Sequence, residues 1–252
     1  MTQNKTFSGP VAAAMFRAGP LTSAGAIFWV HGDNIARHAG SYAEAPPTIS
    51  HALHDPSIAG PFAIAMIVSA VFLSLAIGQV MLALHRIIRL EPAGRPANIV
   101  LLAVISVCEA VAVAGMIVLS QYTGSINSHL HDVGSYMLFF GHAIGISLSG
   151  WLIRRMLEAA PAQSIARNCL EPVSRNPRRA LAVALLSAFY GVVYFGGKML
   201  PDRFDFWHGA VLSITEVIVI MAFLAYLSTF WPLVRLGRPS LASPPAPERG
   251  RT

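Results

Sequence analysis

Long, nearly uniform apolar stretches constrain this chain more than any other feature, because no water-soluble fold needs so many of them. The weakest lies at about 10–30, and the others lie at about 61–84, 98–120, 133–153, 180–200 and 207–231. A helix needs roughly 20 residues to cross a hydrocarbon core of ~30 Å, and each stretch reaches that length. The sequence therefore predicts an all-α fold, a polytopic membrane helix bundle with six transmembrane helices.

The composition leaves little room for a separate soluble domain. Only 12% of the 252 residues are charged, whereas a soluble domain carries about 25%. Six spans with short loops use nearly the whole length, so we expect a single transmembrane domain over residues 1–238. Residues 239–252 are rich in Pro, Ser and Arg, which is typical of a disordered tail. We expect this tail in the cytoplasm.

The charged residues indicate how the bundle lies in the membrane. Arginines are concentrated in the loops at 85–97 and 154–179 and in the tail, while the intervening loops are poor in Lys and Arg. Cytoplasmic loops carry such an excess, so both termini are expected in the cytoplasm. The net charge of +6 then reflects topology and indicates no nucleic-acid partner. An interfacial helix at 10–30, which would leave five spans, is the alternative.

The chain also looks bacterial, because it is Ala-rich and uses Arg far more than Lys. We therefore expect it in a bacterial inner membrane. In the orientation given above, its histidine-rich loops face the periplasm.

Three ionisable side chains lie deep in the apolar stretches. Glu109, His142 and Glu216 fall at a similar depth when the six spans are stacked in alternating directions. A charge at the bilayer centre is unfavourable by several kcal/mol, so such groups face the bundle interior and pair with one another. We predict a cluster of these three, which other polar residues of the spans could join: Gln79, Ser147 or Ser213. It is either a hydrogen-bonded link between helices or a functional site for a headgroup, a proton or a metal.

Histidines gather at the outer side of the predicted bundle. Seven of the nine map to outer loops or outer helix ends: His31, His38, His51, His54, His129, His131 and His208. Neutral imidazole and carboxylate are good zinc ligands. His131, Asp132 and His208 are therefore candidate ligands of a divalent metal such as zinc. Histidines also cap helices, lie at membrane interfaces and bind phosphates, so these alternatives stay open.

Three segments of the chain resemble the Frag/DRAM/Sfk family of six-span membrane proteins. They are the PTIS segment at 47–50, the segment at 131–141 that starts with His-Asp-Val-Gly, and the segment at 207–230 that starts with Trp-His-Gly. The resemblance implies six helices, cytoplasmic termini and a role in membrane lipid biology, without a shared reaction. It also draws attention to Pro47 and Ser50, which could lie over the outer mouth of the bundle.

Three functions fit these features. The first is a lipid-interacting or accessory-subunit role without catalysis, with a polar site in the outer half of the bundle. That site would include Glu109, His142, Glu216, Ser213, Pro47 and Ser50, and its partners would be membrane lipids or a larger membrane protein complex. The second is a metal-dependent hydrolase or transferase that acts on membrane lipid at the outer face. The third is a proton-coupled transporter or channel that uses Glu109, His142 and Glu216. The absence of repeats and of broken helices disfavours it.

Overall fold

The computed structural model describes residues 10–38, 40, 48–49, 53, 55–90, 94–123, 126–197, 199 and 205–235. This part of the chain is helical and holds no strand. The long helices are α1 (Pro10–Arg37), α3 (Pro56–Leu90), α4 (Arg95–Gln121), α5 (Ser128–Ala159), α7 (Asn176–Gly197) and α8 (Asp205–Ser228). The short ones are α6 (Ile165–Leu170), η2 (Glu171–Val173) and α9 (Trp231–Arg235). Six helical segments are long and apolar enough to cross a membrane, which confirms the predicted all-α membrane bundle.

Local sequence signals set where several helices begin. Gly94, with φ of 69°, precedes α4 in a left-handed conformation that suits glycine, and a proline follows within the first turn. The side chain of Asn127 caps α5 by accepting a hydrogen bond from the Leu130 N–H at 3.0 Å. Asp55 caps α3 in the same way, because its Oδ1 accepts from the Ser57 N–H at 2.8 Å. These caps satisfy backbone groups that a helix end would leave unpaired.

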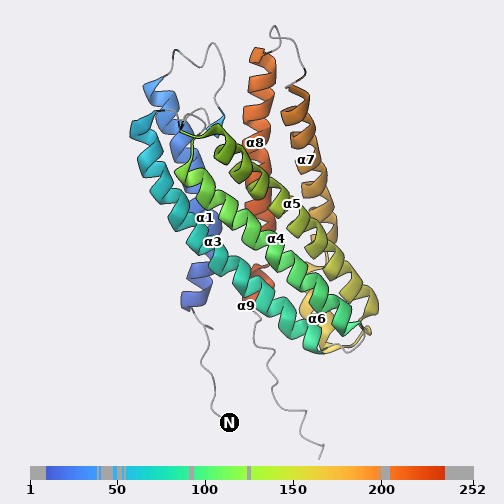
Figure 1. Cartoon of the computed structure of the whole chain (residues 1–252). Coiled ribbons are helices and arrows are strands. Elements are labelled where there is room, and N and C mark those ends of the chain that lie inside the picture. The colour runs from blue at the N-terminus through green and yellow to red at the C-terminus, as the bar shows by residue number, and fades with distance from the viewer. Residues whose placement is uncertain are drawn as a thin grey trace, which may run out of the picture.

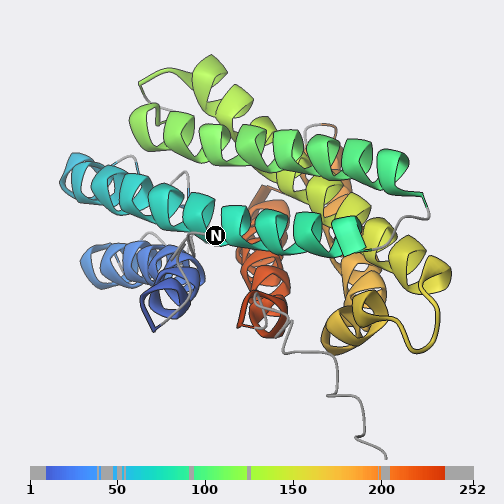
Figure 2. The ribbon, with the colours of Figure 1, turned by 90° about the horizontal axis from the view of Figure 1, so that it is seen from below.

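The six long helices form a ring (Figures 1 and 2). Each packs against the next along the chain, and α8 also packs against α1 and so closes the ring. The weakest predicted span is part of this ring, since α1 packs along α3. Its Arg17 lies over the ring of Trp231 with 4.5 Å between guanidinium carbon and ring centroid, so this cation has an aromatic partner within the bundle.

The described ends of the chain lie at the same end of the ring, where α6 and α9 are also found (Figure 1). We call this the inner end, after the orientation expected from the arginine-rich loops, and the opposite one the outer end. The predicted tail at 239–252 lies outside the described residues.

Helices α4 and α5 approach so closely that their backbones touch. A Cβ atom added to Gly141 would lie 2.8 Å from the carbonyl oxygen of Cys108, and one added to Gly134 would lie 3.2 Å from the carbonyl oxygen of Gly115. Small residues permit such contacts between membrane helices. Small residues recur in α5 every four positions, at Gly141, Gly145 and Ser149, and this spacing serves packing inside the bundle.

Candidate functional site

Two of the three predicted deep ionisable residues form a pair. The Nδ1 atom of His142 in α5 is hydrogen-bonded to Oε2 of Glu109 in α4 at 2.7 Å. Both residues are buried, with 8% and 7% of their surface exposed. Gly145 makes room for the carboxylate, because a Cβ at that position would overlap Glu109 Oε1. The pair therefore ties α4 to α5.

A second polar contact lies further toward the inner end. The hydroxyls of Ser149 and Tyr226 are 2.8 Å apart and both residues are buried. A cavity of about 40 Å³ touches both contacts, since Glu109, His142, Ser149 and Tyr226 all line it. This volume fits about one water molecule. The interior at this level is therefore nearly filled by side chains.

Glu216 has a different partner from the one expected. Its Oε2 atom accepts a hydrogen bond from the backbone N–H of Ile49 at 3.0 Å, and both residues are buried. The carboxylate thus holds the segment at 48–49 against α8. Pro47 and Ser50, predicted to belong to the same site, lie outside the described residues. Ser213, one turn before Glu216, is buried as well.

A small cavity separates Glu216 from the Glu109–His142 pair. It has a volume of about 70 Å³, and its walls include His131, His142 and Glu216. Space of this size holds about two water molecules and is too small for a lipid headgroup. The structure therefore brings Glu109 and His142 into contact and places Glu216 at a cavity that His142 also lines.

The candidate metal ligands on α5 each contact a nearby group. Nδ1 of His131 is 3.0 Å from the carbonyl oxygen of Tyr122, which follows the last turn of α4. Asp132, the next residue, accepts a hydrogen bond at 3.4 Å from the hydroxyl of Tyr194 in α7. His131 thus lies toward the interior, and Asp132 toward α7.

The third candidate ligand lies between α7 and α8. Nε2 of His208 is 3.0 Å from the carbonyl oxygen of Val193. Its ring occupies the space where a side chain of Gly197 would begin. Within the described residues, no three His, Cys, Asp or Glu side chains come together as a metal site would require. The metal site stays a prediction.

An apolar groove between α5 and α7 was not foreseen from the sequence. It has a volume of about 600 Å³, and its lining lies within residues 135–148 of α5 and 184–195 of α7, toward the outer end of both helices. Its lining residues Phe140 and Val192 are exposed, so the groove opens on the outside of the bundle. Aromatic side chains dominate its lining: Tyr136, Phe139, Phe140, Tyr190, Tyr194 and Phe195. Small residues of α7, among them Ala188 and Gly191, also line it. The one signal for this groove in the sequence is that the predicted spans at 133–153 and 180–200 both carry aromatic and small residues.

One aromatic side chain separates the groove from the buried cavity. Phe139 lines both, as does Ser135. The Phe139 ring packs against Tyr190 with 4.6 Å between centroids and lies 6.4 Å from the Phe223 ring. The groove and the cavity with Glu216 and His142 are therefore neighbours across a wall that is one side chain thick.

Comparison with known protein families gives a match over most of the chain. The family model described as the Frag1/DRAM/Sfk1/Cwh43P N-terminal domain matches residues 10–232, which is nearly the whole described chain. No curated protein and no solved structure gives a significant match.

Proposed function

Since the chain belongs to the Frag1/DRAM/Sfk1/Cwh43P family of membrane proteins, we propose that it binds a membrane lipid in the outer half of its bundle and holds this lipid without transforming it. The groove between α5 and α7 carries the proposal. At about 600 Å³ it falls within the ~300–1,000 Å³ typical of ligand sites. Its lining belongs to helices that are apolar enough to span a membrane, so lipid chains are the molecules that reach it.

The shape of the groove matters more than its apolarity. Lipid tails are as apolar as leucine, so a lipid chain gains little by leaving other lipids for the protein. Packing against a rigid aromatic surface provides the selectivity instead. The rings of Tyr136, Tyr194 and Phe195 fix one another, with centroid separations of 5.1–6.2 Å. A preformed surface of this kind loses little conformational entropy when a chain binds.

Polar groups at the outer end of the groove suit a headgroup. Asp132 and the hydroxyl of Tyr194 lie together there, where a carboxylate can accept hydrogen bonds from a lipid amine or hydroxyl. The more deeply buried polar residues have partners inside the protein, namely the Glu109–His142 pair and the backbone N–H that Glu216 binds. We assign them to shaping the bundle around the groove.

The orientation is part of the proposal. The arginine-rich inner end lies in the cytoplasm of a bacterial cell, and the groove then faces the outer leaflet of the inner membrane. The histidine-rich outer loops lie in the periplasm.

The test fills the groove without disturbing the fold. A Cβ added to Gly191, which lines the groove, meets no atom within 4 Å, so the side chain of Gly191→Phe begins in open space. Gly25 of α1 is exposed, and a Cβ there also meets nothing within 4 Å, so Gly25→Phe is the matched control. Lipids that co-purify with gently extracted protein are counted by native mass spectrometry. We expect Gly191→Phe to lose a lipid that Gly25→Phe keeps; equal lipid content in both would refute the proposal.

An accessory-subunit role is the second candidate, and α7 favours it. In the apolar 18-residue stretch of the span Asn176–Gly197 only 17% of the residues are buried inside the protein, against 39–50% in the corresponding stretches of the other five spans. A partner protein could cover this face in place of lipid. A stable additional protein mass in the same native spectra, lost in Gly191→Phe and kept in Gly25→Phe, would support this role over lipid binding.

A further inference from the structure

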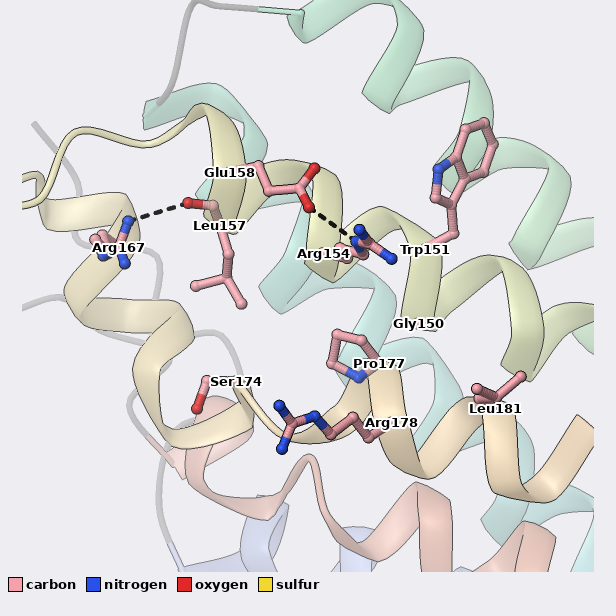
Figure 3. A pocket seen from close by; sticks show the side chains of 10 residues that line it. All are labelled: Gly150, Trp151, Arg154, Leu157, Glu158, Arg167, Ser174, Pro177, Arg178 and Leu181. Atoms are coloured by element: carbon pink, nitrogen blue, oxygen red, sulfur yellow. Dashed lines mark hydrogen bonds and ion pairs between the residues drawn. The ribbon is translucent and has the colours of Figure 1, made fainter.

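A basic pocket occupies the inner end of the seam between α5 and α7 (Figure 3). Its volume is about 710 Å³, and its walls come from the last turns of α5, from α6 and from the first turns of α7. Arg154, Arg167 and Arg178 line it together with a single acid, Glu158. Three positive charges against one negative leave the pocket with a net charge of +2. An anion is therefore the ligand that its electrostatics favour.

Two of the arginines, Arg154 and Arg178, are exposed and have N–H groups available for a ligand. Arg167 is half-buried, and its Nη1 already donates to the carbonyl oxygens of Leu157 and Ala160 at 3.2 and 3.4 Å. Arg154 uses its Nε for Glu158 at 2.8 Å, which leaves the donors on its two Nη atoms. Arg178 is exposed and makes no side-chain hydrogen bond or ion pair within the described part of the chain. A guanidinium presents up to five N–H donors in a geometry that matches phosphate.

The start of α7 adds to the positive field. Helix α7 is 22 residues long and begins at Asn176, next to the pocket residues Ser174 and Pro177. The N-terminus of a helix carries a partial positive charge that favours phosphate groups. In Figure 3 the side chain of Arg154 comes from α5 and that of Arg178 from α7, with Pro177 between them in this view.

The remaining lining is mostly apolar and partly exposed. Trp151 and Leu181 are 53% and 61% exposed, and Leu157 also lines the pocket. Tryptophan is enriched where a membrane meets water. A site with arginines at one side and exposed apolar side chains at the other fits a molecule that carries both a phosphate and a hydrocarbon chain.

We propose that this pocket binds the phosphate of an anionic phospholipid of the inner leaflet, between Arg154 and Arg178, with the lipid chains running along Trp151 and Leu181. The pocket is separate from the outer groove and faces the other leaflet. The same arginines could also accept free phosphate. Basic pockets between transmembrane helices at the cytoplasmic side bind phospholipid headgroups in this manner.

The experiment titrates the full chain in detergent with phosphatidylglycerol and reads binding by native mass spectrometry. Arg178→Gln should weaken binding about fivefold, the factor that ~1 kcal/mol represents for one arginine near an anionic surface. Arg154→Gln with Arg178→Gln should weaken it about 25-fold. Glu158→Gln removes the competing carboxylate and should strengthen it about fivefold. Arg235→Gln, which removes a charge at the inner end outside the pocket, is the matched control and should change binding little.

Two further arms identify the source of the phosphate. Phosphatidylcholine, whose headgroup is neutral overall, should bind more weakly than phosphatidylglycerol. Inorganic phosphate at the same concentration should not displace phosphatidylglycerol, because it lacks the chains that contact Trp151 and Leu181. If phosphate competes as well as the lipid does, the assignment to a lipid is wrong. If the double arginine variant binds phosphatidylglycerol like the unmodified chain, the site itself is refuted.

Binding of phosphatidylglycerol to the basic pocket can be tested independently of the outer groove. Gly191→Phe should leave the preference for phosphatidylglycerol unchanged, because Gly191 lies in the outer half of α7. The co-purifying groove lipid therefore tests only the proposed function, and the preference for phosphatidylglycerol tests only the basic pocket. Glu158→Gln also shows that weaker binding in the arginine variants is not caused by misfolding, because a misfolded protein would not bind the lipid more tightly.

Discussion

Replacing Gly145 with alanine should destabilise the bundle, whereas the same change at Gly25 should stabilise it. Alanine is favoured over glycine in a helix interior by about 1 kcal/mol. At Gly25 a Cβ meets no atom within 4 Å, so this gain should appear in full. At Gly145 the Cβ would overlap Glu109 Oε1 and lie 3.1 Å from its Cδ. The carboxylate must then move away from His142.

The magnitude follows from the hydrogen bond that is lost. The contact between His142 and Glu109 is 2.7 Å long and buried, and a hydrogen bond to a charged group contributes about 1.5–3 kcal/mol. Subtracting the helix-propensity gain leaves a net loss of about 0.5–2 kcal/mol. Glu109→Ala removes the carboxylate that collides, so Gly145→Ala should no longer be harmful in that background.

The assay is a double-mutant cycle on the free energy of unfolding, measured by titrating the protein from mild detergent into SDS. The coupling energy between Gly145→Ala and Glu109→Ala should be about 1.5–3 kcal/mol, as expected for residues in contact. If Gly145→Ala stabilises the protein as much as Gly25→Ala does, the reasoning is refuted. Additive effects of the two changes would refute it as well.

Three other predictions follow from single contacts. Glu216→Leu removes the acceptor for the Ile49 N–H and should destabilise the protein by about 1–3 kcal/mol; amide hydrogen exchange at Ile49 should become fast, while Glu216→Gln keeps an acceptor and protection. Hydrogen bonds from the Ser57 hydroxyl and N–H lower the pKa of Asp55 from 3.8 to about 2, so this carboxylate adds stability above its ordinary pKa that is lost as pH falls through about 2; in Ser57→Ala an NMR titration should show the pKa closer to 3.8. Phe139→Ala joins the groove to the buried cavity and should cost somewhat less than the ~3–5 kcal/mol of a fully buried Phe in the same SDS titration; an unchanged midpoint would contradict its role as a wall.

The fold could be predicted because hydrocarbon imposes a simple rule. A helix must be about 20 residues long and apolar to cross, and even the weak stretch at 10–30 satisfies this within Pro10–Arg37. The Glu109–His142 contact follows from the same rule, since ionisable groups in a membrane seek partners.

Glu216 shows where this reasoning ends. Its partner is the backbone N–H of Ile49, and a backbone donor has no signature in the sequence. The same holds for His131 and His208, each of which lies within hydrogen-bonding distance of a backbone carbonyl oxygen. The sequence places both histidines at the outer end of the bundle, but it does not show whether their side chains point toward one common site.

The groove could not be predicted either, for a different reason. Hydropathy does not distinguish the face of a helix that packs against protein from the face that meets lipid, since both are apolar. Whether Phe140 and Gly191 fill a contact or leave a hollow depends on how far apart α5 and α7 lie, which only the three-dimensional arrangement determines.

The most direct test of lipid binding is to locate a lipid chain on the protein. A phospholipid with a photoreactive group in its acyl chain is reconstituted with the full chain in nanodiscs, irradiated, and the labelled peptides are identified by mass spectrometry. The account predicts labelling concentrated at the groove residues within 135–148 and 184–195, and reduced there in Gly191→Phe but not in Gly25→Phe. Labelling spread evenly over the exposed apolar faces of all six spans, and unchanged in Gly191→Phe, would contradict it.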